Sequence, residues 1–231
     1  MDISKALTFF LKDDRWLVKL LVGTIILFFS FLIIPSFFFI GYMVELVRNV
    51  MDDVDYPLPE WDNWGQLFKE GFALFLVGLV YTIPVWLLMC CSLLLFIPGA
   101  ALEGELSNAF VGMGIVAIMA LTCLMTLFLA AYALISPALT IQYTREEEIA
   151  ACFRLNEIAA ITRNHIGDVL LSLVVIFGLS MVLSLVFIVP ILGWFVAFGA
   201  SVYLSFVMSH LYGQIGAKIE GNARDSGITG V

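Results

Sequence analysis

The chain has 231 residues, of which 62% are hydrophobic and 13% are charged, and its formal net charge is -8. Because ordinary soluble domains carry about 25% charged residues, this composition argues against a soluble enzyme and predicts an all-α, polytopic transmembrane helical bundle. The acidic balance argues against a nucleic-acid partner, since phosphate binding requires clustered Lys and Arg. The four cysteines lack a CxxC pair and there are only two histidines, so no disulfide, metal site or cofactor is predicted.

The first predicted element is an amphipathic helix over residues 3–12. Lys5, Thr8 and Lys12 fall on one face, and only Phe9 departs from the apolar face opposite. A helix of this kind is expected to lie in the membrane interface. The apolar face consists of Ile3, Ala6, Leu7, Phe10 and Leu11.

Four stretches without Asp, Glu, Lys or Arg follow, at residues 20–44, 71–102, 106–144 and 169–217. A membrane span needs about 20 apolar residues, so the second and third stretches are predicted to cross once each. The fourth is predicted to cross twice, with a break at Pro190 and Gly193. The first fits either one crossing helix or two short helices hinged at Pro35.

The eleven Lys and Arg residues distinguish these two alternatives. A single crossing would divide them between the two sides, whereas a hairpin places all eleven on one side. Because Lys and Arg concentrate in cytoplasmic segments, the hairpin is favoured. The chain is then expected to cross the cell membrane about six times, with both termini in the cytoplasm. Residues 17–50 form about 51 Å of helix, less than the roughly 60 Å of two crossings, so the hairpin should be short, kinked or re-entrant.

Residues 48–71 form the most distinctive connection. An acidic run precedes Pro57 and Pro59, which favour extended backbone. This pattern indicates a docking loop for a protein partner or a cation. The alternative, which is favoured for the tryptophans themselves, is an interfacial belt in which their rings lie at the level of the lipid headgroups. The acidic run consists of Asp52, Asp53 and Asp55, and the tryptophans are Trp61 and Trp64.

A second amphipathic surface helix is predicted over residues 64–72. Asn63 is suited to cap its first turn, with Gln66 reaching back as in a capping box.

At the end of the first hairpin, Glu45 and Arg48 are three positions apart on a helix, which predicts a structural ion pair between them.

A Gly-Tyr pair near the end of the first hairpin, followed by Pro-x-Trp-x-x-Trp-Gly-x-Leu-Phe after the acidic run, resembles a known family. It is the prokaryotic, largely archaeal integral membrane family catalogued as domain of unknown function 4013, and the resemblance covers nearly the whole chain. It implies an integral membrane protein without an assigned activity or catalytic residues. The candidate interaction motif consists of Gly41, Tyr42, Glu45, Arg48, Pro59, Trp61, Asp62, Trp64 and Gly65.

Residues 145–163 are predicted to be helical, since they are rich in Ala and Glu and contain neither Gly nor Pro. Together with the two earlier surface helices, they suggest a layout of surface helix plus apolar pair that occurs three times in one integral membrane domain, 1–231. The alternative is that any cytoplasmic connection between spans has this layout. The units would be 2–55, 60–144 and 145–218, followed by a flexible tail, 219–231.

Small residues recur at every fourth position of the last predicted span. This face favours close helix packing, with a polar lining for a transport pathway as the alternative. Ser180 and Ser184 are expected to meet this face, and His210 is expected to form a hydrogen bond in the membrane interface. The face consists of Ala197, Ser201, Ser205 and Ser209. At the start of the fifth span, a solvated helix terminus is favoured over a polar site for Arg163, Asn164, His165 and Asp168.

The functional expectation is a non-catalytic scaffold or a membrane protein that binds a partner or lipids. The middle of each predicted span lacks carboxylates, Lys and Arg, and no pair of a nucleophile and a base is evident in the sequence. An enzyme is therefore not expected. Helix-breaking Pro84 and Pro137 keep a transporter or channel for small molecules or lipids as the alternative. The expected partners are membrane lipids and a protein at the acidic cytoplasmic face, with homo-oligomerisation left open.

Overall fold

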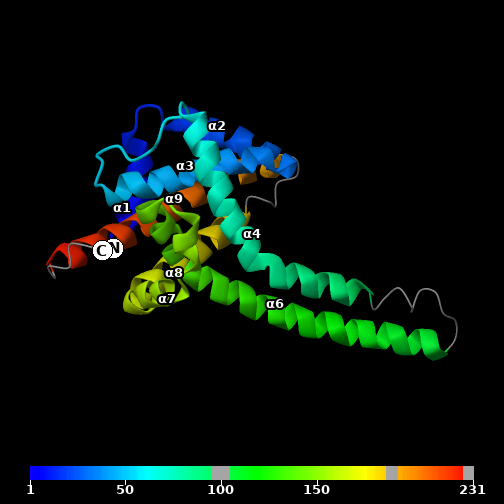
Figure 1. Cartoon of the computed structure of the whole chain (residues 1–231). Helices are drawn as coiled ribbons and strands as arrows, with labels where there is room; N and C mark the ends of the chain where they lie inside the picture. Colours follow the sequence, from blue (N-terminus) through cyan, green and yellow to red (C-terminus); the bar gives the residue numbers. More distant parts are fainter. Residues whose placement is uncertain (95–104, 186–191, 226–231) are drawn as a thin grey trace. The chain divides into compact units, whose positions relative to one another are not determined.

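The computed structural model describes residues 1–94, 105–185 and 192–225, and every regular element in these ranges is a helix (Figure 1). Five of these helices are long and apolar enough to cross a membrane, and a bent N-terminal pair raises the number to 6. The expected all-α class with several possible spans is therefore confirmed.

The N-terminal segment is a bent helix pair. α1 (Ile3–Thr8) runs into the 3-10 turn η1 (Phe9–Lys12), and α2 (Trp16–Phe28) runs into η2 (Phe29–Leu32), with a bend of 100° between the two parts. The change of helix type at Phe9 rotates this side chain into the core, which explains why it departs from the α-helical pattern. Ala6 packs with Val207 and Leu211, so part of the apolar face of residues 3–12 covers protein, while Leu11 is exposed. The expected place of this helix in the membrane interface stays a prediction.

The predicted hairpin is present, with its turn at Ile33 between η2 and α3 (Ile34–Met51). Ile33 has a φ of 67°, a backbone conformation that β-branched residues rarely adopt. Pro35 lies in the first turn of α3, where its missing N–H leaves no helical hydrogen bond unmade.

The second predicted surface helix is not a separate element. α4 (Trp64–Leu94) runs without a break from the expected surface segment into the apolar stretch. Asn63 does cap it: the Gln66 N–H donates to Asn63 Oδ1 over 3.4 Å, and the Asn63 side-chain amide donates to Gln66 Oε1 over 2.7 Å. The reciprocal bond of a capping box is thus made between side chains.

The expected helix over residues 145–163 is wrong as one element. α6 (Glu105–Glu146) ends just before Glu147, whose φ of 54° leaves the right-handed helical region. The turn η3 (Ile149–Phe153) and α7 (Leu155–Asn164) follow. Three consecutive glutamates at the negative end of the α6 dipole disfavour continuation of the helix.

The last two helices are α8 (Ile166–Ser184) and α9 (Leu192–Asp225). Pro190, one part of the expected break, lies outside the described residues, whereas Gly193 belongs to the first turn of α9 and does not break it. Because α9 extends to Asp225, it includes residues 219–225 of the segment expected to form a flexible tail.

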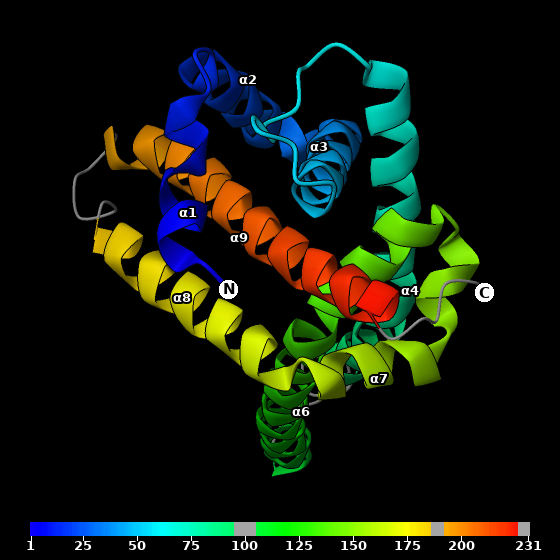
Figure 2. The ribbon, with the colours of Figure 1, turned by 90° about the vertical axis from the view of Figure 1, so that its left-hand side faces the viewer.

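The chain divides into two compact units, 1–75 with 134–231, and 76–133. The expected organisation in three units stays a prediction. In the first unit, α9 packs against α1, α2, α3 and α8 (Figure 2). Its core joins side chains from distant parts of the sequence: Phe9, Phe10, Phe39, Tyr42, Met43, Leu46, Leu58, Leu67, Val202 and Phe206.

Three glycines allow the helices of the first unit to approach closely. A Cβ atom on Gly41 would overlap the backbone carbonyl of Leu67, and one on Gly71 would overlap the carbonyl of Phe37. On α9, a Cβ on Gly213 would lie 2.5 Å from the Cβ of Val50. The α3–α4 and α3–α9 contacts therefore depend on the absence of side chains at these positions.

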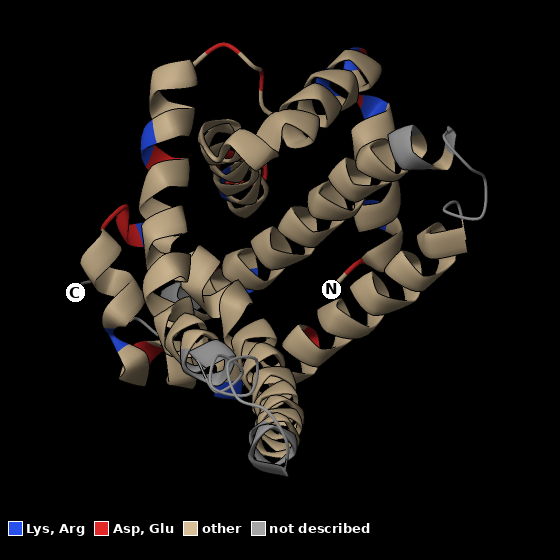
Figure 3. Cartoon of the chain, turned by 90° about the vertical axis from the view of Figure 1, so that its right-hand side faces the viewer, with Lys and Arg blue, Asp and Glu red and all other residues tan. Residues whose placement is uncertain are grey.

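The second unit contains parts of α4 and α6 whose apolar side chains face outward. Trp86 and Met119 are more than half exposed, as are many neighbours. An apolar cavity of about 170 Å³ lies between the two helices, lined by Pro84, Val85, Leu121, Leu124, Met125 and Phe128. Figure 3 shows that charged residues lie mainly near helix ends and in connections, while most of each described helix is uncharged.

Candidate functional site

The connection after α3 consists of an anchored part and an exposed part. In residues 57–61, backbone carbonyls and the Trp61 ring are held by hydrogen bonds to the helix hairpin. These bonds join Asn49 Nδ2 to the Pro57 carbonyl (2.9 Å), Lys19 Nζ to the Leu58 carbonyl (2.9 Å), Tyr42 Oη to the Pro59 carbonyl (2.9 Å) and Trp61 Nε1 to the Lys19 carbonyl (3.1 Å). Because each bond fixes main-chain or ring position, this half is rigid.

Lys19 is the central cation of the anchored part. It is only 3% exposed, and its ammonium lies 2.5 Å from the Asp13 carboxylate and 3.0 Å from that of Glu60. A buried charge requires such compensation, and losing one partner is strongly destabilising. The arrangement ties the start of α2 to the connection that follows α3.

Trp61 and Tyr42 are stacked, with ring centroids 4.0 Å apart and an angle of 15° between the planes. Trp64 follows at 5.8 Å from Trp61 and is exposed. Trp61 therefore packs against Tyr42 and is partly buried, and the expected interfacial belt of tryptophans stays a prediction. Pro59, Tyr42 and Trp61 from the expected interaction motif are brought together here.

Residues 52–56 are the exposed part, and they begin with a Schellman motif. The Asp53 N–H donates to the Val50 carbonyl (3.3 Å) and the Val54 N–H to the Asn49 carbonyl (3.0 Å), with Asp53 at a φ of 53°. Exposed side chains occupy this turn and the two residues after it: Asp52, Asp53, Val54, Asp55 and Tyr56. The backbone is thus fixed while the carboxylates remain accessible.

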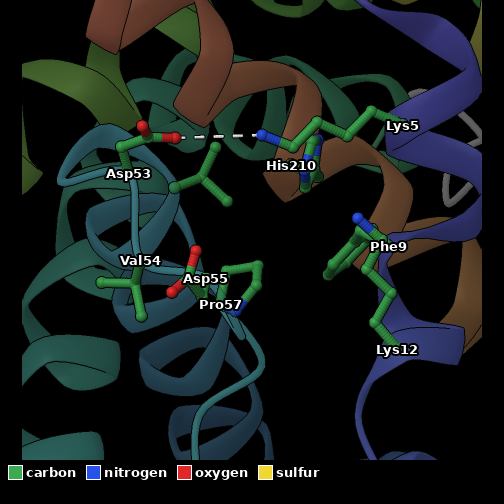
Figure 4. A pocket seen from close by; sticks show the side chains of 9 residues that line it. Lys5, Phe9, Lys12, Asp53, Val54, Asp55, Pro57 and His210 are labelled. Atoms are coloured by element: carbon green, nitrogen blue, oxygen red, sulfur yellow. Dashed lines mark ion pairs between the residues drawn. The ribbon is translucent and has the colours of Figure 1, made fainter.

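This exposed turn forms one wall of a small cavity, here called the N-terminal pocket (Figure 4). The ammonium of Lys5 lies 3.8 Å from the Asp53 carboxylate across it. In Figure 4, Lys5 and Lys12 come from one side and Asp53 and Asp55 from the other. The pocket is lined by Lys5, Phe9, Lys12, Val50, Asp53, Val54, Asp55, Pro57 and His210.

His210 closes the pocket from α9 and is only 1% exposed. Its ring lies against that of Phe9, with centroids 4.4 Å apart. Gln214 Nε2 lies 3.0 Å from His210 Nδ1. The expected hydrogen bond of His210 is thus present, and its partner is the Gln214 side chain on the same helix.

A second polar cluster joins α3, α4 and the end of α6. Arg48 pairs with Glu70 at 2.9 Å and with Glu147 at 3.3 Å, so the expected partner, Glu45, is wrong. Gln66 also donates to Glu70 over 2.9 Å. Within the described residues, the Oε2 atoms of Glu45 and Glu70 and the Nε of Arg48 are buried without a hydrogen-bond partner.

The other motif residues serve packing or lie at the surface. Gly41 contacts α4 as described above, whereas Asp62 and Gly65 are exposed. On α9, Ala197 and Ser209 are buried, while Ser201 and Ser205 donate to carbonyls of their own helix. Ser180 and Ser184 also bond within their own helix; Ser180 is partly buried and Ser184 is exposed. Gly213 and Gly216 of α9 instead lie directly against Val50 and Met51 of α3.

At the start of α8, Asp168 accepts a hydrogen bond from Lys218 of α9 over 2.7 Å. His165 Nδ1 lies 3.9 Å from the same carboxylate. This helix terminus is therefore tied to α9, which the expectation of a merely solvated terminus did not include. Arg163 and Asn164 lie in the last turn of α7 and are exposed.

Sequence reasoning missed the pocket itself. Lys5 and Lys12 appear in the sequence only as the polar face of a surface helix, and His210 lies 155 positions or more after the acidic run. The one local signal is Phe9, whose departure from the apolar face marks the place where η1 turns toward α9.

Comparison with known families gives one match. The family described as "Protein of unknown function (DUF4013)" matches residues 28–192, which is more than half of the chain. Neither the curated proteins nor the solved structures contain a significant match.

Proposed function

The chain belongs to this family of unknown function. From the geometry of the chain itself, we propose that it is a non-catalytic integral membrane protein that binds a lipid or a protein partner at the N-terminal pocket. The observation that carries this proposal is the exposed acidic turn on a rigid support. Residues 57–61 are fixed by hydrogen bonds to the hairpin, whereas Asp52, Asp53 and Asp55 face outward. A surface that is already ordered loses less entropy when it binds a partner.

Although Asp53 pairs with Lys5, stability alone does not account for all three carboxylates. They follow the C-terminus of α3, where the helix dipole places partial negative charge and where Lys or Arg would be favourable. Each carboxylate in such a position costs about 0.3–1 kcal/mol at low ionic strength. A ligand with a positive charge explains why the turn carries them, since binding then offsets this cost.

The proposal places the protein in the cell membrane with both termini in the cytoplasm. The outward apolar side chains of α4 and α6 support a lipid environment, because in water such surfaces associate or aggregate. The hairpin supports the orientation, since it permits all eleven Lys and Arg residues to lie on one side. In a variant without native cysteines, Ile33→Cys should react with a membrane-impermeant maleimide from outside the cell; reaction only after lysis would contradict this topology.

Affinity purification from native membranes, with mass spectrometry of retained lipids and proteins, tests the binding proposal. The variant Asp53→Asn/Asp55→Asn should lose a specific lipid or protein that the unaltered chain retains. The control Asp14→Asn/Glu148→Gln removes the same charge at two other exposed positions and should retain it. Equal retention by both variants would contradict the proposed site, and turnover of a co-purified ligand would contradict a non-catalytic role.

Transport is the second candidate, and the cluster of Arg48, Glu70 and Glu45 favours it. Ionisable groups within apolar helices are expensive and frequently mark ion or substrate pathways. Under this alternative, proteoliposomes should show solute or ion flux that Glu70→Gln abolishes, with Lys69→Gln as a control on the adjacent exposed position. Flux at the rate of protein-free liposomes would remove the candidate.

A further inference from the structure

The N-terminal pocket has walls of opposite charge. Lys5 and Lys12 approach from α1 and η1, and Asp53 and Asp55 approach from the turn after α3 (Figure 4). Lys5 and Asp53 lie within 3.8 Å of each other. Lys12 and Asp55, in contrast, form no ion pair or hydrogen bond with any described residue. One cation and one carboxylate thus face the pocket unpaired.

The hydrogen-bonding state of His210 follows from its neighbour. The Asp2 N–H donates to Gln214 Oε1 over 2.6 Å, which fixes the orientation of this amide. Gln214 Nε2 then donates both to the Asp2 carbonyl over 2.9 Å and to His210 Nδ1 over 3.0 Å. Because Nδ1 accepts, the proton of the neutral ring is on Nε2. The Nε2–H bonds no described residue, and so it is a donor available to a ligand in the pocket.

These groups recognise a ligand with a negative and a positive end. Lys5, Lys12 and the His210 Nε2–H suit an anionic phosphate, for which charge-assisted bonds are strong. Asp53 and Asp55 suit a cation, and the C-terminus of α3 adds partial negative charge to the same wall. The single aromatic ring of Phe9 does not form the aromatic cage that binds quaternary ammonium groups. The carboxylates instead favour a primary ammonium, which can donate hydrogen bonds.

The size of the pocket limits the ligand. The space inside is about 20 Å³, close to the room that one buried water requires, so it admits one phosphate oxygen and does not enclose a whole headgroup. The rest of a headgroup therefore lies outside the pocket, against the exposed side chains of Lys12 and Asp55. Apolar residues Val50, Val54 and Pro57 adjoin the charged groups and suit the start of a lipid glycerol region.

We propose that the N-terminal pocket binds the phosphoethanolamine headgroup of a membrane phospholipid. Its phosphate lies between Lys5, Lys12 and His210, and its ammonium lies between Asp53 and Asp55. This inference rests on the proposed function, because it names the lipid class that occupies the same surface.

The test is native mass spectrometry of the purified full chain with phosphatidylethanolamine, phosphatidylcholine and phosphatidylglycerol of identical acyl chains. Phosphatidylethanolamine should bind at least about tenfold more tightly than the other two, since each lost charge-assisted bond weakens binding by about that factor. Lys12→Met and Asp55→Asn should each remove this preference. The controls Lys69→Met and Asp14→Asn change exposed residues that form no described ion pair and should keep it. Size-exclusion chromatography verifies that all four variants fold.

Equal binding of phosphatidylcholine would overturn recognition of a primary ammonium, and preference for phosphatidylglycerol would overturn recognition of a zwitterion. Soluble phosphoethanolamine should compete only weakly; if it bound as tightly as the lipid, a free metabolite would replace the lipid as ligand. If no lipid is preferred but Asp53→Asn/Asp55→Asn still loses a protein partner, the inference fails and the proposed function stands. If neither lipid nor protein depends on these residues, both fail.

Discussion

The guanidinium of Arg48 on α3 lies 2.9 Å from the carboxylate of Glu70 on α4, and the Glu70 side chain is only 8% exposed. This pair connects two helices of the first unit within the polar cluster that also includes Gln66 and Glu147. Substituting only one partner leaves a buried charge without compensation, whereas removing both charges does not.

Arg48→Met should therefore lower the free energy of unfolding by about 3–5 kcal/mol, and Arg48→Met/Glu70→Gln should recover most of this loss. Thermal denaturation in detergent, monitored by size-exclusion chromatography, measures both effects. Equal losses in the single and the double variant would show that Arg48 contributes through packing of its aliphatic stem and not through its charge.

Gly41→Ala and Gly71→Ala should each separate α3 from α4, because the added methyl group would overlap the backbone carbonyls of Leu67 and Phe37. Overpacking of this kind costs about 1–3 kcal/mol or more. Gly65→Ala is the matched control, since a methyl group added there would have no atom within 4 Å and alanine favours helix by about 1 kcal/mol. Comparison of the three melting temperatures decides the matter, and a stable Gly71→Ala variant would contradict the close approach.

Asp53→Gly should raise stability slightly, and Asp53→Val should lower it. Asp53 has a φ of 53°, which glycine adopts freely and a β-branched residue does not. The expected difference between the two variants is about 1–2 kcal/mol. Urea or thermal unfolding measures it, with Asp52→Gly as a control at a position of ordinary φ. A more stable Asp53→Val would be incompatible with the Schellman geometry.

Cys152 should titrate at alkaline pH. Burial raises the pKa of its thiol from 9.0 to about 11, and the charge of Glu146 adds to the effect. When the pKa of an acid is higher in the folded state than in the unfolded state, the folded state holds the proton more tightly. The free energy of unfolding then falls as the pH rises above the pKa of the unfolded state. Folding stability should thus fall between pH 9 and pH 11, and Cys152→Ala should remove this part of the decline.

The ¹³Cβ chemical shift of Cys152 checks the pKa directly, in a variant with serine at Cys90, Cys91 and Cys123. A midpoint near the ordinary thiol pKa of 9.0 would contradict burial of this side chain.

Local patterns predicted the elements whose causes are local. The apolar stretches predicted the helices, and Pro35 predicted the hairpin to within two residues, because proline is accepted in the first turn of a helix. The turn itself is at Ile33, whose unusual φ has no sequence signal. Likewise, the three consecutive glutamates at 146–148 disfavour a continuous helix but do not single out Glu147 as the point where α6 ends.

Contacts between helices were the harder part. Helical spacing made Glu45 the obvious partner of Arg48, but the partner is on another helix, and a single sequence does not show which helices are neighbours. For the same reason the pocket was not foreseen, since Lys12, Asp55 and His210 meet only in the folded chain.

The bond between Gln214 and the backbone of Asp2 joins positions 212 residues apart, and Tyr203 donates to the carbonyl of Leu7 across 196. During synthesis, α3 is complete on the order of 10 seconds before the part of α9 that covers it, given ribosomal rates of roughly 5–20 residues per second. During this interval the N-terminal third lacks its main packing partner, α9. Since His210 arrives with α9, the pocket is assembled last, and an occupied pocket marks a chain that has finished folding.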